Sequence, residues 1–174
     1  MEDNWNILGR NNKDMTRVIP QIDTSVRSVH TSDRKGVKPT IIVLHHTAGT
    51  NSLAYLTKNS AQASTHALIP KSGKIYRMVP DELGANTVGF SAIGNYSKWP
   101  TLKGIVSCNR MSLNIEIENR GDGKDLYTAE QINATAWQIV QWRKKYGYLF
   151  LLSHQVIDTN GKVDPLGFNW FDLD

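Results

Sequence analysis

The sequence lacks several features that would place it in a class at once. Cys108 is its single cysteine, which excludes an internal disulfide and fits a cytosolic or an external protein equally. No apolar run approaches the roughly 20 residues of a membrane-spanning helix. The start, MEDNWNILGRNNKD, has neither the basic nor the apolar region of a secretory signal. We therefore expect no signal peptide, synthesis in the cytoplasm and no membrane partner.

Motifs for nucleotides and nucleic acids are also missing. The chain has no C-x-x-C pair, no P-loop and no aromatic motif of the RNA-binding kind. Its 20 Lys and Arg against 16 Asp and Glu give a net charge of +4 and a pI near 9.2. This modest excess favours an anionic partner, such as nucleic acid, an acidic lipid or a wall polymer, without choosing one. Because the basic residues are scattered, we expect a solvated surface and no nucleic-acid partner.

The composition that is present indicates one folded domain. A chain of 174 residues, 40% of them hydrophobic, is long enough to bury one sizeable core. The first part is polar and is interrupted by Pro20, so we interpret residues 1–38 as an N-terminal arm packed on the core. Residues 39–174 are then the functional domain.

Three later segments have the pattern of strands. The stretch TIIVLHH, residues 40–46, is a near-continuous apolar run, typical of a strand covered on both faces in an α/β fold. In MSLNIEIEN, residues 111–119, apolar and polar residues alternate, so Asn114, Glu116 and Glu118 should share one face. The stretch LFLLSH, residues 149–154, reads as a further buried strand that ends in a histidine.

The remaining patterns predict a hairpin, two helices and a long loop. Residues 65–80 read as two strands joined by a turn at 71–74, with Pro70 indicating an edge position. A short helix should follow Asn51 or Ser52 as its cap. The strongest helix should begin at a Thr128–Gln131 capping box, end at Gly147 and bury the stripe Ile132, Ala136, Ile139, Val140 and Arg143. The glycine-rich connection at 84–104 is expected to form a wall of a groove.

Two of the buried strands end in histidine, at His45 and His154. Residues at strand ends of an open α/β sheet converge on the crevice where ligands bind. Asp164 follows ten residues after His154, in an extended stretch restricted by Pro165, and Lys162 projects to the same side of the chain. Two imidazoles and a carboxylate suit a catalytic zinc site with an open fourth position, and they also describe a mononuclear iron oxygenase. A nearby lysine and a strand glutamate favour hydrolysis.

Four motifs in order carry a family resemblance: TIIVLHHTAG, STHALIPKSGKIYRMVP, SLNIEIEN and SHQVIDTNGKVDP. With them, residues 39–172 resemble the zinc-dependent N-acetylmuramoyl-L-alanine amidases of the amidase-2 and peptidoglycan-recognition-protein superfamily. The resemblance implies a single α/β domain with a central mixed β-sheet flanked by helices, and Zn²⁺ in a groove at the sheet's edge. It assigns the zinc ligands to His45, His154 and Asp164, the last at a place where some relatives carry cysteine.

The resemblance also implies catalytic roles. Glu116 would be the general base and Lys162 would stabilise the oxyanion, with Glu118 as a competing candidate for the base. His46 would lie on the other strand face with a packing or hydrogen-bonding role and no bond to zinc. Residues expected on the substrate side are His46, His66, Thr65 and Asn114. The chain departs from the family at Thr65, where several relatives carry a catalytic tyrosine, and at residues 87–91, whose substrate contacts stay open.

The function implied is hydrolysis of the amide bond between N-acetylmuramic acid and L-alanine in peptidoglycan. We expect a monomer that acts on the cell wall as a phage endolysin, after phage-mediated release, or as another wall-lytic enzyme such as an autolysin fragment. A cytosolic amidase that recycles anhydro-muropeptides would use the same chemistry. A peptidoglycan-binding module without hydrolysis is the alternative from another class, although members of that kind typically lack one or more zinc ligands.

Overall fold

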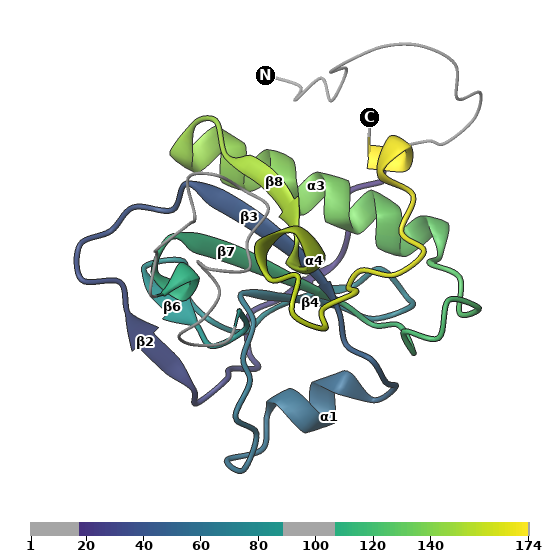
Figure 1. The fold of residues 1–174 in the computed structure, drawn as a ribbon, viewed down its shortest axis with the longest axis horizontal. Coiled ribbons are helices and arrows are strands. Elements are labelled where there is room, and N and C mark those ends of the chain that lie inside the picture. The colour runs from purple at the N-terminus through teal and green to yellow at the C-terminus, as the bar shows by residue number, and fades with distance from the viewer. Residues whose placement is uncertain (1–17, 89–106, 174) are drawn as a thin grey trace.

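The computed structural model describes residues 18–88 and 107–173, which form a mixed sheet with helices on both faces (Figure 1). The order of the six strands is β1-β5-β4-β7-β3-β8. Their bounds are β1 Ile22–Asp23, β5 Ile75–Arg77, β4 Ala67–Ile69, β7 Ser112–Ile117, β3 Ile41–His46 and β8 Phe150–Ser153. A separate antiparallel pair joins β2, Thr31–Asp33, to β6, Leu83–Ala85. The predicted single α/β domain with a mixed sheet is confirmed.

The centre of the sheet is parallel. Strand β3 pairs in parallel with β7 on one side and with β8 on the other, and β4 continues the parallel pairing on the far side of β7. Within this sheet, among the described residues, only β4 and β5 pair antiparallel, as the predicted hairpin. Since parallel strands end at the same edge, the carboxyl ends of β3, β4, β7 and β8 lie together, and this arrangement brings polar residues from separate segments into one place.

Both faces of β3 are buried, as its apolar run predicted. On one face Ile42 and Leu44 join the core cluster that includes Ile139 and Trp142 of α3, Ala129–Tyr146. On the other face Val43 packs in a cluster with Ile157 of α4, His154–Ile157. The helix α1, Ser52–Leu56, also packs on this second face, through Leu56 against Leu68. Figure 1 shows α4 in front of the central strands and α1 below them.

The helix ends agree only in part with the predicted caps. At α3 the Thr128–Gln131 capping box is present, and Gly147 follows the helix with a φ of 81°. At α1 neither predicted side-chain cap forms, because Asn51 adopts a left-handed conformation and its side chain makes no cap hydrogen bond. The amide of Ser52 instead donates to a carboxylate oxygen of Glu118, at 3.0 Å. A residue 66 positions away in the chain therefore takes the place of the local cap.

Two further predictions were wrong in detail. The stripe expected on α3 was correct at Ala136 and Ile139, which are buried, but Ile132, Val140 and Arg143 are only partly buried. The helix also buries residues outside this stripe, three of them polar, which a purely apolar pattern overlooks: Gln131, Ala134, Thr135, Gln138 and Trp142. The edge position inferred from Pro70 was also wrong. Strand β4, which ends just before this proline, lies inside the sheet between β5 and β7. The proline is tolerated because it follows the last paired residue.

The described part of the predicted arm contributes strands to both sheets. Strand β1 pairs with β5 at one edge of the large sheet, and β2 pairs with β6. Arg34, next to β2, is 4% exposed and donates hydrogen bonds to the backbone carbonyls of Asp81 and Ser112. Two short 3₁₀ helices, Cys108–Arg110 and Trp170–Leu173, complete the described elements. Among the described residues, no helix is long and apolar enough to cross a membrane.

Candidate metal centre

Three predicted residues meet at the carboxyl edge of the sheet. The Nδ1 atoms of His45 and His154 are 3.1 Å apart, and Oδ2 of Asp164 lies 3.1 Å from the first and 3.0 Å from the second. The three atoms thus form a nearly equilateral triangle. His45 is 1% exposed, His154 3% and Asp164 8%. Of the residues the structure describes, these three form the one group of acidic, histidine or cysteine side chains that could hold a metal ion.

The dimensions of this triangle fit a tetrahedral ion. Metal bonds of about 2.0–2.1 Å to nitrogen and oxygen imply ligand atoms roughly 3.3 Å apart in a tetrahedral site. The observed separations are slightly shorter, so an ion of this size is accommodated by outward shifts of roughly a few tenths of an ångström. Three ligands also leave a fourth position for water or substrate. The donor set therefore suits a catalytic rather than a closed structural site.

Each ligand comes from a different local structure. His45 is the fifth residue of β3 and faces the side of the sheet that carries α1 and α4. His154 was predicted as a strand end, but β8 stops at Ser153 and His154 opens the single turn of α4. The hydroxyl of Ser153 caps this turn by accepting from the Val156 amide. The segment of Asp164 returns to α4, where its carbonyl accepts from the Gln155 amide.

The charges of His45 and Asp164 are those a cation requires. Burial lowers the pKa of His45, which keeps its imidazole neutral at pH 7. Burial alone would raise the pKa of Asp164, but its contacts with the two histidines hold that pKa well below the ordinary value. A neutral imidazole and an ionised carboxylate are the forms that bind metal.

Glu116 lies directly beside this triangle. It pairs in register with His45 across the parallel β3–β7 ladder, so both side chains leave the sheet on the same face. Burial, reinforced by the charge of Asp164, raises the pKa of Glu116 to about 8, although the charge of Lys162 acts in the opposite direction. Its Oε2 is buried without a hydrogen-bond partner among the described residues. The group is therefore poised to hold or release a proton near neutral pH.

The other two charged candidates are placed differently. Lys162 is exposed, and its charge acts on the carboxyl of Glu116. Glu118 is one residue beyond the end of β7, and its carboxylate accepts the hydrogen bond from the Ser52 amide. The alternation prediction placed both glutamates on one face. Among the described residues, Oε2 of Glu116 has no hydrogen-bond partner, whereas Oε2 of Glu118 accepts from the Ser52 amide.

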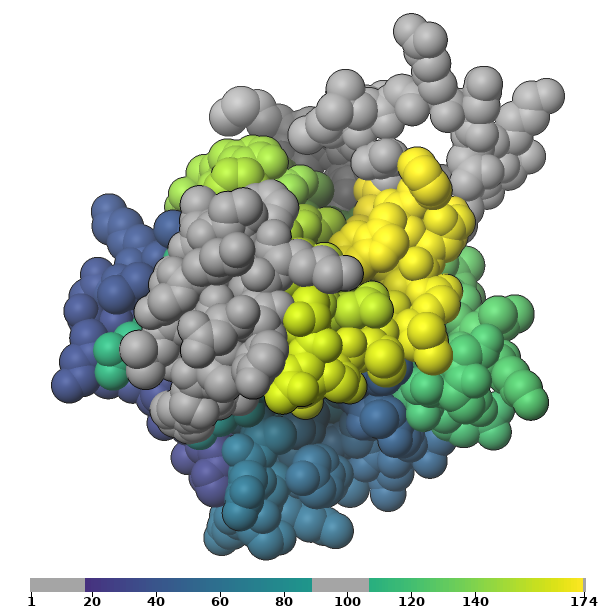
Figure 2. Space-filling model, viewed as in Figure 1, coloured from purple at the N-terminus to yellow at the C-terminus, as the bar shows by residue number. Residues whose placement is uncertain are grey.

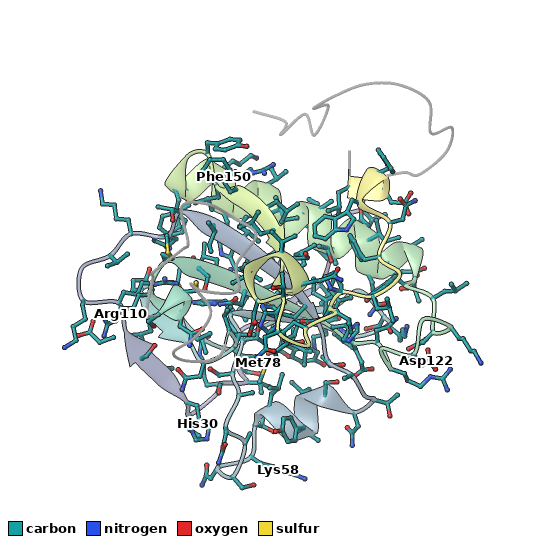
Figure 3. The ribbon with its side chains drawn as sticks, viewed as in Figure 1. His30, Lys58, Met78, Arg110, Asp122 and Phe150 are labelled. Carbon is teal, nitrogen blue, oxygen red and sulfur yellow. The ribbon has the colours of Figure 1, made fainter. Side chains whose placement is uncertain are left out.

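His46 holds two loops together. Its Nδ1 accepts a hydrogen bond from the Leu166 amide at 3.1 Å, two residues after the ligand Asp164. A Cβ added at Gly121 would lie 2.7 Å from Nε2 of the same ring, so the loop after β7 packs directly against the imidazole. Asp122, labelled in Figure 3, belongs to this loop. His46 is not part of the metal triangle, which agrees with the hydrogen-bonding role expected for it.

Thr65, His66 and Asn114 lie inside the protein and bond to one another. All three are fully buried. The Thr65 hydroxyl donates to the Asn114 carbonyl, and His66 accepts the Asn114 amide at Nδ1 while its Nε2 lies 3.0 Å from the Leu83 carbonyl. That these residues contact substrate stays a prediction. Their polar groups are satisfied inside the protein because the polar face of β7 is covered.

Sequence reasoning overlooked two residues that support the site. Arg34 approaches Nε2 of His66 at 3.0 Å, yet it was assigned to a polar arm and gave no signal of burial. Gly121 has a φ of 72°, and the only available signal was its place in the turn-forming stretch NRGDG. The groove wall was predicted at residues 84–104. The structure describes residues 84–88 of this stretch, and residues 89–104 lie outside the described residues.

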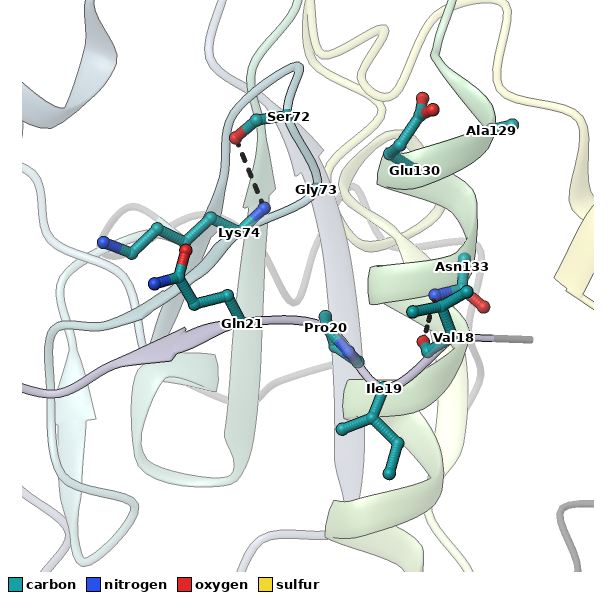
Figure 4. A pocket seen from close by; sticks show the side chains of 10 residues that line it. All are labelled: Val18, Ile19, Pro20, Gln21, Ser72, Gly73, Lys74, Ala129, Glu130 and Asn133. Atoms are coloured by element: carbon teal, nitrogen blue, oxygen red, sulfur yellow. Dashed lines mark hydrogen bonds between the residues drawn. The ribbon is translucent and has the colours of Figure 1, made fainter. Parts of the chain in front are cut away.

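A cavity of about 600 Å³ lies away from these residues (Figure 4). Residues 18–21, the β4–β5 turn and the start of α3 line it, and the Asn133 side chain donates to the Val18 carbonyl across it. It contains none of the predicted site residues. On the face drawn in Figure 2, the yellow-green segment that includes α4 lies above the blue segment around α1, and the green segment after β7 lies to the right. The metal triangle, rather than the cavity, is the candidate site.

Comparisons with known proteins identify what this arrangement resembles. Residues 35–167 match the family model Amidase_2, described as N-acetylmuramoyl-L-alanine amidase. No curated protein sequence matches the chain. Among solved structures, a selenomethionine derivative of AmpD superposes with a TM-score of 0.67 at 23% identity, over 88% of this chain and 92% of that one.

Two further structures extend the comparison. The amidase AmiD from E. coli, in complex with anhydro-N-acetylmuramic acid-L-Ala-D-gamma-Glu-L-Lys, gives a TM-score of 0.63 at 26% identity over 87% of this chain. The present chain spans 60% of the AmiD chain. The endolysin LysCS from Clostridium intestinale gives 0.58 at 19% identity, over 89% of this chain and 92% of that one. At identities below 25%, AmpD and LysCS bear on the fold alone.

Proposed function

Because the chain belongs to the Amidase_2 family of N-acetylmuramoyl-L-alanine amidases, we propose that His45, His154 and Asp164 hold the zinc ion of its active site. The family activity, hydrolysis of the bond between N-acetylmuramic acid and L-alanine in peptidoglycan, is the activity of this chain. The observation that carries the zinc assignment is the buried triangle of two Nδ1 atoms and one carboxylate oxygen. Zinc supplies a Lewis acid for the amide carbonyl and activates water at neutral pH.

Glu116 is proposed to carry the proton during hydrolysis. It would accept the proton of the attacking water and return it to the leaving amine of L-alanine. Two observations support it over Glu118: its position beside His45 in the ladder and the buried Oε2 without a partner among the described residues. A carboxyl with a pKa of about 8 exchanges protons readily at neutral pH. The carboxylate of Glu118 already accepts a hydrogen bond from the backbone of α1.

Lys162 is proposed to stabilise the negative charge that develops on the carbonyl oxygen. Its charge acts on Glu116, which supports a location at the rim of the site. Its exposure is consistent with a long side chain that reaches over the substrate once the groove is filled. A fixed cation at this point would contribute to catalysis because the charge it stabilises appears only as the reaction proceeds.

The biological setting is proposed to be cell-wall lysis of the endolysin type, by a monomer made in the cytoplasm that reaches the wall after phage-mediated release. The net charge of +4 supports action on an anionic wall polymer. The bound ligand of AmiD indicates that a muropeptide is the substrate unit in a relative. A recycling amidase would instead act on soluble anhydro-muropeptides.

One digestion experiment tests the proposal. Purified protein, analysed for metal, should hold close to one zinc per chain and release new L-alanine amino termini from intact sacculi, and a chelator should abolish the release. Cleavage of a soluble anhydro-muropeptide but not of sacculi would overturn the lytic role and favour recycling. Zinc bound without cleavage of either substrate would point to a binding module. Cleavage that persists after complete removal of metal would overturn the zinc assignment.

A further inference from the structure

The two histidines of the triangle differ in what holds their second nitrogen. Nε2 of His45 lies 3.2 Å from Oδ1 of Asn114, whose side chain is fully buried. Nε2 of His154 is buried and has no hydrogen-bond partner among the described residues. The orientation of His45 is therefore fixed by an amide on the neighbouring strand, two residues before Glu116, whereas His154 lacks such a support among these residues.

The amide of Asn114 is itself held in one orientation. Its Nδ2 donates to the Ser112 hydroxyl at 2.9 Å, which leaves Oδ1 directed at His45. Its backbone amide donates to His66, and its carbonyl accepts from the Thr65 hydroxyl. These buried polar groups converge on a single side chain. Such a fully bonded cluster resists rotation because each alternative leaves a buried donor or acceptor unpaired.

The consequence for His45 is a choice between two tautomers. A neutral imidazole carries one proton, so a nitrogen that donates to Oδ1 leaves the other with a free lone pair. With the proton on Nε2, the lone pair of Nδ1 points into the triangle, where an ion accepts it. The opposite tautomer would direct an N–H at the metal position and would leave Oδ1 of Asn114 without its donor.

We propose that Asn114 is a positioning residue that fixes the tautomer and ring orientation of His45 and thereby sets the metal affinity of the site. This inference rests on the zinc site of the proposed function. Partners of metal-bound histidines commonly contribute about 10- to 100-fold to metal affinity. Asn114 contacts a ligand and not the substrate, so its loss should act on metal binding first and on catalysis through it.

The test compares the zinc affinity of four proteins by competition with a chromophoric chelator. Asn114→Leu and Asn114→Ser both remove the acceptor, one with an apolar and one with a small polar replacement, so that at least one folded variant is available. Gln138→Leu is the matched control, because Gln138 is also fully buried but lies on α3. We expect about 10- to 100-fold weaker zinc binding for the Asn114 variants and no change for the control.

A second measurement reads the tautomer without metal. In the metal-free protein, the Asp164 carboxylate at Nδ1 and Oδ1 of Asn114 at Nε2 compete for the single proton of the neutral His45 ring. The ¹⁵N spectrum should therefore show a smaller Nε2–H fraction in the Asn114 variants than in the parent. If a folded Asn114 variant keeps the parent zinc affinity and the parent Nε2–H fraction, the inference is wrong. If neither variant folds while Gln138→Leu does, a parent His45 protonated wholly on Nδ1 would overturn it and a measurable Nε2–H fraction would support it. A parent that binds no zinc would refute the proposed function, and the tautomer measurement would still decide the role of Asn114.

Discussion

His45 and Glu116 are direct neighbours across the parallel ladder of β3 and β7. This pairing places a ligand of the candidate metal centre beside a carboxyl whose pKa is raised to about 8. The relationship depends on strand register, because a shift of one residue would turn Glu116 to the opposite face. The candidate metal ligand and the candidate proton carrier are therefore positioned by the same hydrogen-bonded pair of strands.

Removal of a ligand should abolish metal binding. We expect His45→Ala and His154→Ala to lose zinc, since two remaining ligands hold it poorly. His46→Ala is the matched control and should keep its zinc, because the His46 ring bonds the Leu166 amide and not the triangle. Metal content per folded chain is the measurement. Zinc that stays in His45→Ala and leaves His46→Ala would show that the two neighbours have exchanged roles.

Glutamate substitutions should separate the base from its neighbour. Glu116→Gln should fold, retain zinc and cleave muropeptide about 10²- to 10⁴-fold more slowly, because a positioned proton carrier is lost. Glu118→Gln should keep most of the activity, since this carboxylate accepts from the Ser52 backbone. The assay is release of L-alanine amino termini, with zinc measured in each protein. A dead Glu118→Gln beside an active Glu116→Gln would move the base two residues along the strand.

Lys162→Met should also retain zinc and fold. The loss of a cation at the developing oxyanion predicts a fall in kcat of about 10²- to 10³-fold with little change in KM. Lys124→Met, an exposed lysine of the loop after β7, serves as the control for a lost positive charge. An equal kcat for Lys162→Met and Lys124→Met would mean that Lys162 contributes only to the net charge of the protein and does not act on the oxyanion.

Packing of the loop after β7 against His46 can be tested with two glycines. Gly121 and Gly123 both have a φ of 72°, so alanine strains the backbone equally at each. At Gly121 the added Cβ would also lie 2.7 Å from the His46 ring, whereas at Gly123 its nearest neighbour is Leu166 Cδ2 at 3.5 Å. We expect Gly121→Ala to lower the free energy of unfolding by roughly 1–3 kcal/mol more than Gly123→Ala. The measurement is denaturant titration of both variants. Equal losses of unfolding free energy would show that the His46 ring moves away from the added Cβ without cost.

His66 should give the metal-free protein a specific sensitivity to acid. Burial lowers its pKa from the model-peptide value of 6.5 to about 3, so the unfolded chain binds a proton in this range that the folded chain does not. Its contribution to stability is therefore complete above pH 6.5 and is lost as the pH falls toward 3. We expect His66→Gln to show a shallower decline in the free energy of unfolding between pH 7 and 5, by up to about 1.4 kcal/mol per pH unit. If the free energy of unfolding falls equally steeply with pH in the parent and in His66→Gln, the folded protein does not lower the pKa of His66.

The central strands and the ligands could be predicted because their signals are local. The apolar run before His45 and the alternation around Glu116 each depend on a few consecutive residues, and both patterns match the paired strands. The capping box at Thr128 is equally local. The three ligands followed from strand ends and from the family resemblance, and the structure brings them together.

The other predictions failed where long-range contacts decide. Nothing near α1 in the sequence indicates that Glu118 takes the place of its cap, and nothing near β2 indicates that Arg34 is buried beside His66. For Asn114, alternation predicts which strand face carries the side chain but not what covers that face. The cover comes from chain segments far away, and the resulting hydrogen bonds gave Asn114 a supporting place inside the protein.

The ligand triangle joins parts of the chain that are far apart in sequence. His45 is separated by 109 residues from His154 and by 119 from Asp164. An ion held there acts as a removable cross-link between a central strand and the last part of the chain, and it stabilises only the folded form. Depletion of metal would therefore loosen the C-terminal segment and expose it to proteases. The supply of the metal ion would then govern how long each molecule survives, besides whether it can cut its substrate.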